Sequence, residues 1–309
     1  MDQAARNKGF VASLVPLDTQ ALAPHITAFD RALAAKLHGS MRYLERGRNK
    51  RADPQRVLPG AQSILCVALP YNGRHNESLA TGPLSATYAR GEDYHAVIKE
   101  HLLEICTPLP KGTWKICVDT SAVMEKAWAE IAGIGWMGRH GLIITKNFGS
   151  YVYLAEVLLT MPCDKKPQPL PRLCGNCHKC ETICPTQALS NGVLDARRCI
   201  AYCTLEDASS TEETYGWHAG CDLCQQVCPF NQKALKASPP PPAQLPWLML
   251  LQETDGERRQ RLSHSALGYV RDEHARKNLI QAARYAIQEG LFPMTEEALL
   301  ALRRLSLHE

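Results

Sequence analysis

The chain begins with apolar side chains at helical spacing. In residues 1 to about 50 they fall on roughly one helical face, at Ala21, Ile26, Phe29, Leu33 and Leu37. The helical spacing of apolar residues then stops. The run 62–69 is short and apolar, contains β-branched residues and ends at Pro70. Such a run predicts a buried strand.

Helical and strand-like periods alternate as far as residue 159. We predict a helix at 93–106, a strand at 114–119, a second helix ending near 132, and strands at 141–145 and 151–159. Thr120 or Ser121 is the expected N-cap of the second helix. This alternation predicts a mixed α/β domain over residues 1–165.

Two further regions follow this domain. Residues 166–237 are rich in cysteine, and the run 238–243 contains four consecutive prolines, which is typical of a stiff spacer. The third region, 238–309, is polar and shows helical spacing at 279–287 and 296–305. One helical hairpin is too small to stand alone, so we expect it to pack on the rest of the chain or to resemble one unit of a helical repeat.

The composition is that of a soluble globular protein, since 45% of the 309 residues are hydrophobic and 21% are charged. The formal net charge of +4 permits an anionic partner without requiring one. The N-terminus shows neither an apolar signal-peptide core nor a twin-arginine pair, and no apolar run approaches the roughly 20 residues that span a bilayer. We therefore expect a cytoplasmic protein with no membrane partner.

Nine of the thirteen cysteines lie between Cys174 and Cys228, a clustering that points to metal binding in a reducing compartment. The first run has the spacing Cys-x2-Cys-x2-Cys-x3-Cys-Pro, at Cys174, Cys177, Cys180 and Cys184. Two-residue spacings let one loop supply three thiolates to a 4Fe–4S cluster, and the cysteine before proline ligates the other cluster of a pair. The sequence therefore predicts two 4Fe–4S clusters.

A second, shorter run consists of Cys221, Cys224 and Cys228, and its missing ligand is expected to be Cys199. In the crossed pattern, one cluster is held by Cys174, Cys177, Cys180 and Cys228, and the other by Cys184, Cys199, Cys221 and Cys224. Two alternatives stay open, namely a pair of zinc sites and the use of Cys203 in place of Cys199. The remaining cysteines are expected to be core residues; they are Cys66, Cys106, Cys117 and Cys163.

Two further features could carry chemistry. Gly133, Gly135 and Gly138 match the dinucleotide fingerprint, but they follow a predicted helix instead of a strand, so a helix C-cap and a tight turn explain them better. Asp119 ends a predicted strand just before a helix. Partial burial there would raise its pKa and suit it to general acid catalysis, whereas the alternative is a simple helix cap.

Motifs outside the cysteine runs carry a family resemblance. They are RADP at 51–54, LPG at 58–60, YARGEDYH at 88–95, VDTS at 118–121 with Glu125, AGIGWMGRH at 132–140, GS at 149–150, DARRCIAY at 195–202 and GCDLCQ at 220–225. With these motifs, the chain resembles the epoxyqueuosine reductases, which use cobalamin and iron–sulfur clusters to finish queuosine at the wobble position of certain tRNAs. The resemblance covers residues from about 40 to 285.

The resemblance implies an α+β protein with three parts. These are a cobalamin-binding α/β domain that is nitroreductase-like and reductive-dehalogenase-like, a ferredoxin-like domain with two 4Fe–4S clusters, and a short C-terminal helical segment that is HEAT-like. The implied reaction removes the epoxide oxygen as water, with electrons passing through the clusters to cobalamin. Asp119 falls on the family's proposed proton donor.

The resemblance also implies how cobalamin binds. It is expected in the base-off form with no histidine ligand, because the family lacks the Asp-x-His-x-x-Gly loop of cobalamin-dependent mutases, and this chain lacks it too. The expected contacts are Asp119, Trp136, Arg139, His140, Ile143, Leu154, Ala201 and Asp222. Arg139 stands where the family more often has lysine, and Ala201 and Cys203 replace the usual serine and leucine.

The implied partners are tRNA carrying epoxyqueuosine and an external one-electron donor such as a flavodoxin or ferredoxin system, and a monomer is expected. Family members usually continue beyond the position of Glu309 with helical repeats that help to hold tRNA. Two rival functions are reductive dehalogenation of a small organohalide and electron carriage without cobalamin.

Two basic stretches are candidates for phosphate contact, or else for an ordinary solvated surface. The first consists of Arg42, Arg46, Arg48, Lys50 and Arg51. The second consists of Arg258, Arg259, Arg261, Arg271, Arg276, Lys277 and Arg284.

Overall fold

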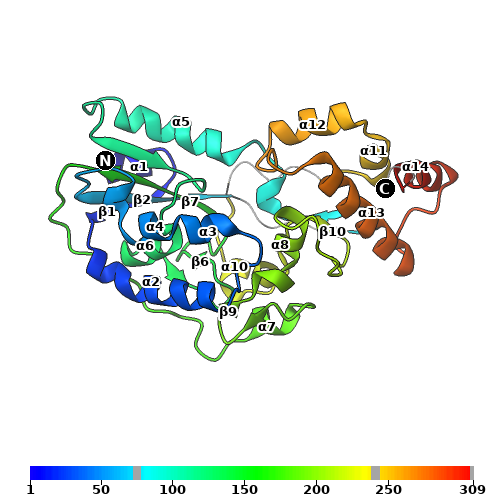
Figure 1. Cartoon of the computed structure of the whole chain (residues 1–309), viewed down its shortest axis with the longest axis horizontal. Helices are drawn as coiled ribbons and strands as arrows, with labels where there is room; N and C mark the ends of the chain where they lie inside the picture. The colour runs from blue at the N-terminus through cyan, green and yellow to red at the C-terminus, as the bar shows by residue number, and fades with distance from the viewer. Residues whose placement is uncertain (72–77, 238–243, 307–309) are drawn as a thin grey trace.

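The computed structural model describes residues 1–71, 78–237 and 244–306. The molecule is elongated, with the N-terminal domain at one end and the C-terminal helices at the other (Figure 1). The predicted proline spacer at 238–243 lies outside the described residues. Within the described ranges, none of the helices is long and apolar enough to cross a membrane.

An antiparallel four-stranded sheet is the frame of the N-terminal domain. Its strands are, in spatial order, β1 (Val11–Pro16), β2 (Ser63–Pro70), β7 (Val152–Leu159) and β4 (Trp114–Cys117). The first six residues of β2 are buried, as expected for a central strand that is covered on both faces. The predicted strands at 62–69, 114–119 and 151–159 are confirmed to within two residues.

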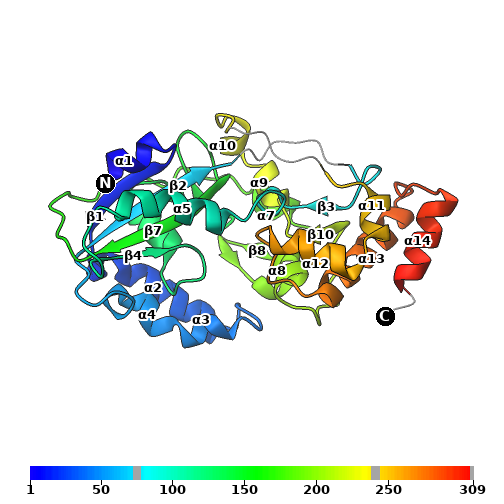
Figure 2. The ribbon, with the colours of Figure 1, turned by 90° about the horizontal axis from the view of Figure 1, so that it is seen from above.

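Helices cover both faces of this sheet (Figure 2). On one face lie α2 (Thr19–Ala34) and α6 (Glu125–Ile131), whose Trp128 is fully buried. On the other face lie α1 (Asp2–Asn7) and α5 (Tyr94–Cys106), so the helix predicted at 93–106 is confirmed. The domain therefore has two apolar cores, one on each side of the sheet, and their burial is its main source of stability.

The prediction that the first 50 residues are helical throughout is wrong, because β1 lies among them. This edge strand pairs with β2 alone, and its half-buried side chains give a weak strand signal that the pairing decides. Short helices α3 (Arg42–Arg46), α4 (Arg48–Ala52) and η1 (Pro54–Arg56) follow α2. The strand predicted at 141–145 shrinks to β6 (Ile143–Ile144), which pairs with β5 (Trp136–Met137).

The cysteine segment consists of short elements joined by loops. They are α7 (Lys179–Ile183), β8 (Leu189–Ser190), β9 (Val193–Leu194), η3 (Ala196–Arg198), α8 (Ile200–Leu205), β10 (Trp217–Ala219), α9 (Leu223–Gln226) and α10 (Pro229–Gln232). Strand β10 pairs in parallel with β3 (Leu84–Ser85), which η2 (Thr87–Ala89) follows. A piece of the N-terminal sequence thus completes the fold around the cysteines.

Helices form the C-terminal end. They are α11 (Trp247–Gln252), α12 (Asp255–Ser263), α13 (Asp272–Gln288) and α14 (Glu296–Ser306). Trp247 Nε1–H donates to the Leu79 carbonyl at 2.5 Å, and Asn278 Nδ2–H donates to the Thr204 carbonyl at 2.7 Å. The predicted hairpin corresponds to α13 and α14, and the expectation that it packs on the rest of the chain is confirmed.

Candidate active site

The chain turns sharply between β4 and α6, and Asp119 lies at the bend with a φ of 51°. A non-glycine residue in this left-handed region is uncommon and marks a constrained turn. Helix α6 begins only at Glu125, with Met124 as its N-cap. The prediction that Thr120 or Ser121 caps the helix is therefore wrong, because tight turns occupy the residues between strand and helix.

Asp119 itself differs from both expectations for it. Its side chain is 59% exposed, so the expected partial burial is wrong. It does not cap α6 either, because its side chain accepts no N–H of the helix and a helix side chain instead accepts the N–H of Asp119. The backbone N–H of Asp119 donates to Oε1 of Glu125 at 2.6 Å, so a carboxylate in the first turn of the helix holds the bend in place.

His95, the second residue of α5, faces Asp119. Its Nε2 lies 3.4 Å from Oδ2 of Asp119, which is an ion-pair distance, and its Nδ1 lies 2.6 Å from Oδ1 of Asp93. The contact with Asp119 raises the pKa of His95, partial burial opposes this, and Asp93 adds a second rise, so the net shift is upward. We did not single out His95 from the sequence, although it closes the YARGEDYH motif.

Glu125 and Lys126 lie behind Asp119. Burial, and next the charge of Asp119, raise the pKa of Glu125 to about 7. Lys126 reaches solvent but is placed deep among protein atoms, and this desolvation lowers its pKa. Its Nζ–H donates to the Gly141 carbonyl at 2.9 Å, and its charge acts on Cys199. Lys126 therefore links the surroundings of Asp119 to the cysteine segment.

The charge of Asp119 acts on four tyrosines from distant parts of the chain. They are Tyr43 of α3, Tyr88 of η2, Tyr94 of α5 and Tyr269 of the loop before α13. Burial is the largest cause of a raised pKa in each of them, and the charge of Asp119 contributes to the rise. Asp119 therefore lies within electrostatic range of both the N-terminal domain and the loop before α13.

The first predicted group of cysteines comes together in the structure. Burial raises the pKa of Cys228, and the nearby charges of Cys174 and Cys177 raise it further. Burial raises the pKa of Cys180 to about 11, and the charge of Cys174 contributes to this rise. Cys228, which is more than forty residues further along the chain, thus lies beside the first run, as the crossed pattern requires.

The members of the second predicted group lie within electrostatic range of one another. Burial raises the pKa of Cys221, Cys224 and Cys199. The charge of Cys199 acts on both Cys221 and Cys224, while Cys184 acts on Cys199 and Cys224. Cys180 of the first group also acts on Cys224, so the two groups are neighbours.

Cys203, the alternative to Cys199, is buried beside Ala196 and Tyr202, and its Sγ–H donates to the Arg197 carbonyl at 3.7 Å. Among the described residues, no three His, Cys, Asp or Glu side chains lie close enough together to hold a single metal ion. Three of the scattered cysteines are buried in the cores as predicted, and the fourth is partly buried; they are Cys66, Cys106, Cys117 and Cys163.

The glycine motif after α6 serves the backbone, as predicted. Gly133 follows the C-cap Ala132 with a φ of 73°, a conformation that favours glycine at a helix end. A Cβ at Gly135 would lie 2.4 Å from the Ile144 carbonyl oxygen, so the close approach of two chain segments requires glycine there.

Three of the expected cobalamin contacts already have protein partners. Trp136 is 2% exposed and packs edge-on against Phe230, and Arg139 lies 3.5 Å from Glu181. Asp222 is 1% exposed, and the backbone N–H and the hydroxyl of Thr87 donate to its carboxylate at 2.8 and 2.7 Å. The others are differently placed: Ile143 and Leu154 belong to the apolar cluster under α6, and Ala201 lies on α8.

His140 has an unsatisfied donor. Its Nδ1 accepts the N–H of Leu142 at 3.2 Å, and burial, with a contribution from Lys126, lowers its pKa to about 4. The ring is therefore neutral at pH 7 and carries its proton on Nε2. That buried Nε2–H has no partner in the described part of the chain, so the site fits a polar group of a bound ligand.

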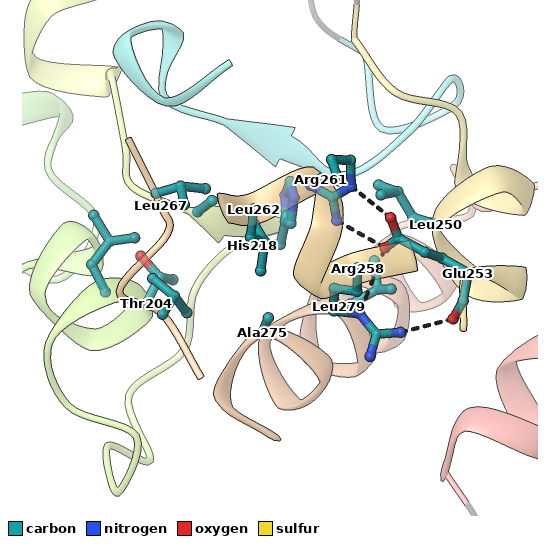
Figure 3. Close-up of a pocket in the computed structure, with 13 residues that line it drawn as sticks. Thr204, His218, Leu250, Glu253, Arg258, Arg261, Leu262, Leu267, Ala275 and Leu279 are labelled. Carbon is teal, nitrogen blue, oxygen red and sulfur yellow. Dashed lines mark hydrogen bonds and ion pairs between the residues drawn. The ribbon is translucent and has the colours of Figure 1, made fainter. Parts of the chain in front are cut away.

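The two basic stretches differ in their partners. At the C-terminal end, ion pairs join Arg258 and Arg276 to Asp255, Arg261 to Glu253, and Arg259 to Asp272 (Figure 3 draws the Glu253 pairs). In the other stretch, Arg48 is paired and Arg51 is buried. Arg42, Arg46 and Lys50 are exposed and form no ion pair with any residue of 1–71, 78–237 or 244–306.

Two family models match the chain. The model described as "Epoxyqueuosine reductase QueG, DUF1730" matches residues 51–120. The model of a 4Fe-4S double cluster binding domain matches residues 173–231, which contain all eight predicted cluster cysteines.

Known proteins extend the match to most of the chain. An epoxyqueuosine reductase of Synechococcus sp. (strain RCC307) is 36% identical over 302 residues, which are 90% of this chain and 91% of that protein. A crystal structure of epoxyqueuosine reductase with an epoxyqueuosine-modified tRNA-Tyr stem loop is 31% identical with a TM-score of 0.75, over 89% of this chain and 77% of that one. A Bacillus subtilis epoxyqueuosine reductase, with its catalytic aspartate loop swung out of the active site, is 28% identical with a TM-score of 0.76, over 91% and 78%. This chain therefore belongs to the epoxyqueuosine reductase family.

Proposed function

We propose that this protein reduces epoxyqueuosine to queuosine at the wobble position of tRNA. Family membership supports this function, and so does one observation: Lys126 lies within electrostatic range of both Asp119, which pairs with His95, and Cys199 of the second cysteine group. Removing the epoxide oxygen as water consumes two electrons and two protons. A site that joins acid groups to a double 4Fe–4S segment suits that balance.

Two 4Fe–4S clusters are held in the crossed arrangement. Cys174, Cys177, Cys180 and Cys228 ligate one cluster, and Cys184, Cys199, Cys221 and Cys224 ligate the other. The electrostatic contacts within each group support this assignment. The three parts are residues 1–165, which bind cobalamin in a nitroreductase-like fold, the ferredoxin-like 166–237, and the HEAT-like 238–309.

Cobalamin supplies the electrons at the substrate when it is bound. The Nε2–H of His140, which has no partner among the described residues, and the exposed Lys126 fit its polar side groups, while Ile143 and Leu154 offer apolar contact. Because Nε2 of His140 carries the proton, this ring would serve as a hydrogen-bond donor to the bound group. Trp136, Arg139, Ala201 and Asp222 would contribute through backbone or contact surface.

Asp119 donates a proton to the leaving oxygen. Its exposed side chain is free to meet a substrate, and the left-handed bend fixes where its backbone lies. His95 holds the carboxyl from one side and is itself fixed by Asp93. Protonated His95 stabilises the Asp119 carboxylate after each proton transfer, so His95 acts as a positioning residue.

The tRNA contacts the surface of α3 and α4. Arg42, Arg46 and Lys50 offer unpaired positive charge, and the exposed Tyr43 among them offers a face on which a base can stack. The charge of Asp119 acts on Tyr43, so this surface borders the candidate active site. Phosphate contact by the C-terminal basic stretch stays a prediction, and carboxylates already pair with four of its arginines.

The decisive test uses anaerobically purified protein with cobalamin, a strong reductant and tRNA that carries epoxyqueuosine. Mass spectrometry of the digested tRNA should show the loss of one oxygen with wild type and essentially none with Asp119→Asn. Conversion by both proteins would show that Asp119 is not the essential proton donor. Conversion by neither, with both clusters and cobalamin present, would favour the dehalogenase alternative, which a halogenated aromatic substrate then tests.

A corrinoid absorption spectrum after anaerobic loading tests the electron-carrier alternative, since such a carrier binds no cobalamin. His140→Ala should weaken cobalamin binding in the same titration while leaving cluster absorption unchanged, because the Nε2–H donor is lost. We further infer a cytoplasmic monomer that receives electrons from an external one-electron donor of the flavodoxin or ferredoxin type.

A further inference from the structure

Glu156 is an ionisable residue in the middle of the central sheet. It lies on β7, opposite Cys66 of β2 and Cys117 of β4, and is 1% exposed. Neither of its carboxyl oxygens has a hydrogen-bond partner within the described residues. A buried carboxylate without a partner is costly, so this carboxyl is protonated at neutral pH. Burial and the charge of Glu125 raise its pKa in the same direction.

Glu125 stands between this buried acid and Asp119. It occupies the first turn of α6, and its Oε1 accepts the backbone N–H of Asp119 at 2.6 Å. The titratable and charged groups that face it come from the bend, from its own helix, from α4 and α5, and from the sheet. They are Asp119, Lys126, Arg51, Tyr94, His95, Cys117 and Glu156.

The two acids are electrostatically coupled, so the ionisation of one opposes that of the other. At neutral pH the pair therefore retains at least one proton. Because burial and Asp119 raise the pKa of Glu125 to about 7, Glu125 exchanges its proton readily near neutral pH. Burial without a hydrogen-bond partner among the described residues disfavours ionisation of Glu156. These two carboxyls are a small store of protons directly behind an exposed acid.

The reaction needs such a store. As the epoxide C–O bonds break and the alkene forms, the oxygen takes up two protons and leaves as water, while the external donor provides two electrons. Asp119 carries one proton at a time. We propose that Glu125, backed by Glu156, supplies the second proton by recharging Asp119, directly or through one water. This inference rests on the proposed function, and it makes Glu125 a positioning residue that acts through Asp119.

The test is a single-turnover measurement with protein that is loaded with both cofactors and reduced beforehand, so that electron delivery does not limit the rate. Glu125→Gln keeps the acceptor for the Asp119 N–H but carries no proton. We expect its rate at pH 7 to fall on the order of 10-fold or more, with unchanged tRNA affinity. Glu104→Gln, at the exposed far end of α5, is the matched control and should behave as wild type.

The pH profile separates a proton store from a structural role. In wild type the store is full below about pH 7 and empties above it, so the rate should fall as the pH rises through that value. In Glu125→Gln this fall in rate at high pH should be absent. If the wild type is active and Glu125→Gln has the same rate and the same fall in rate above pH 7, the proton-store proposal is overturned while the proposed function stands. A wild type that is inactive on the modified tRNA would overturn the proposed function and the inference with it.

An infrared titration without substrate gives a readout that does not depend on turnover. The protonated carboxyl band that Glu125→Gln removes should titrate near pH 7 in wild type. In Asp119→Asn its midpoint should move to lower pH, because a negative charge that raises the pKa of Glu125 is gone. A Glu125 that is ionised across the whole range would contradict the proposal.

Discussion

The helices α3–α4 and the helices α12–α13 are both rich in arginine, yet the structure uses their charges differently. In α12–α13 the arginines meet Glu253, Asp255 and Asp272 and stabilise the packing of helices against one another. In α3–α4 the acid Glu45 is bound by Lys36 and His38, which leaves the neighbouring cations unpaired.

This comparison teaches that a count of basic residues does not locate a nucleic-acid surface. A cation that is already paired loses its partner, or shares it, when it meets a phosphate, so its net contribution to binding is small. An unpaired surface cation has only water and counterions to release. We therefore expect charge changes in α12–α13 to alter stability, and charge changes in α3–α4 to alter tRNA binding.

The largest effect should come from Arg258→Ala. This side chain is 2% exposed and contacts Glu253 and Asp255, so its removal takes one of two arginine partners from the buried Glu253 side chain and leaves a cavity between the helices. The free energy of unfolding should fall by about 3 kcal/mol. Urea unfolding followed by circular dichroism measures this loss. If Arg258→Ala is as stable as wild type but binds tRNA more weakly, the assignment of the α12–α13 arginines to stability is wrong.

The next effect is on binding. Replacing Arg42, Arg46 and Lys50 together by alanine should lower the affinity for the modified stem loop on the order of 10-fold or more. The slope of log affinity against log salt should become shallower by roughly three, because about three counterion-releasing contacts are lost. Fluorescence anisotropy at several salt concentrations measures both quantities. The matched control replaces the ion-paired Arg259, Arg261 and Arg276, and it should leave the salt slope unchanged.

Tyr43→Ala should lower the affinity by a further, smaller factor while the salt slope stays the same. Stacking of one base on an aromatic ring contributes roughly 1–3 kcal/mol and releases no counterion. Tyr43→Phe keeps the ring and should bind as wild type does. If Tyr43→Phe is as weak as Tyr43→Ala, the hydroxyl and not the ring is responsible.

The smallest effect should come from Arg259→Ala. Its ion pair with Asp272 is 2.9 Å long but lies on the surface, where its side chain is 66% exposed. Such pairs contribute about 0.5 kcal/mol, and salt screens them. Unfolding midpoints at low and high salt should differ little from wild type. A large loss of stability or of tRNA affinity would show that the surface pairs of α12–α13 matter more than their exposure indicates.

The double 4Fe–4S segment was predictable because spacing along the chain limits which thiolates one loop can bring together. The central strands were predictable because burial on both sides of a sheet leaves a continuous apolar run. Residue motifs were enough to indicate the family, which the comparisons then confirmed. The edge strand β1 was missed because its side chains are half-buried, and only its pairing with β2 decides its structure.

The sequence by itself therefore determined the cluster segment, the central strands and the identity of Asp119 as a candidate acid. The tertiary structure alone decided that His95 and Glu125 reach Asp119 and which arginines are paired. It also decided that Glu156 is buried in the sheet with no hydrogen-bond partner among the described residues. The reason is physical. Ligand spacing and hydrophobic period are local properties of the chain, whereas charge pairing and burial depend on which distant segments the fold brings into contact.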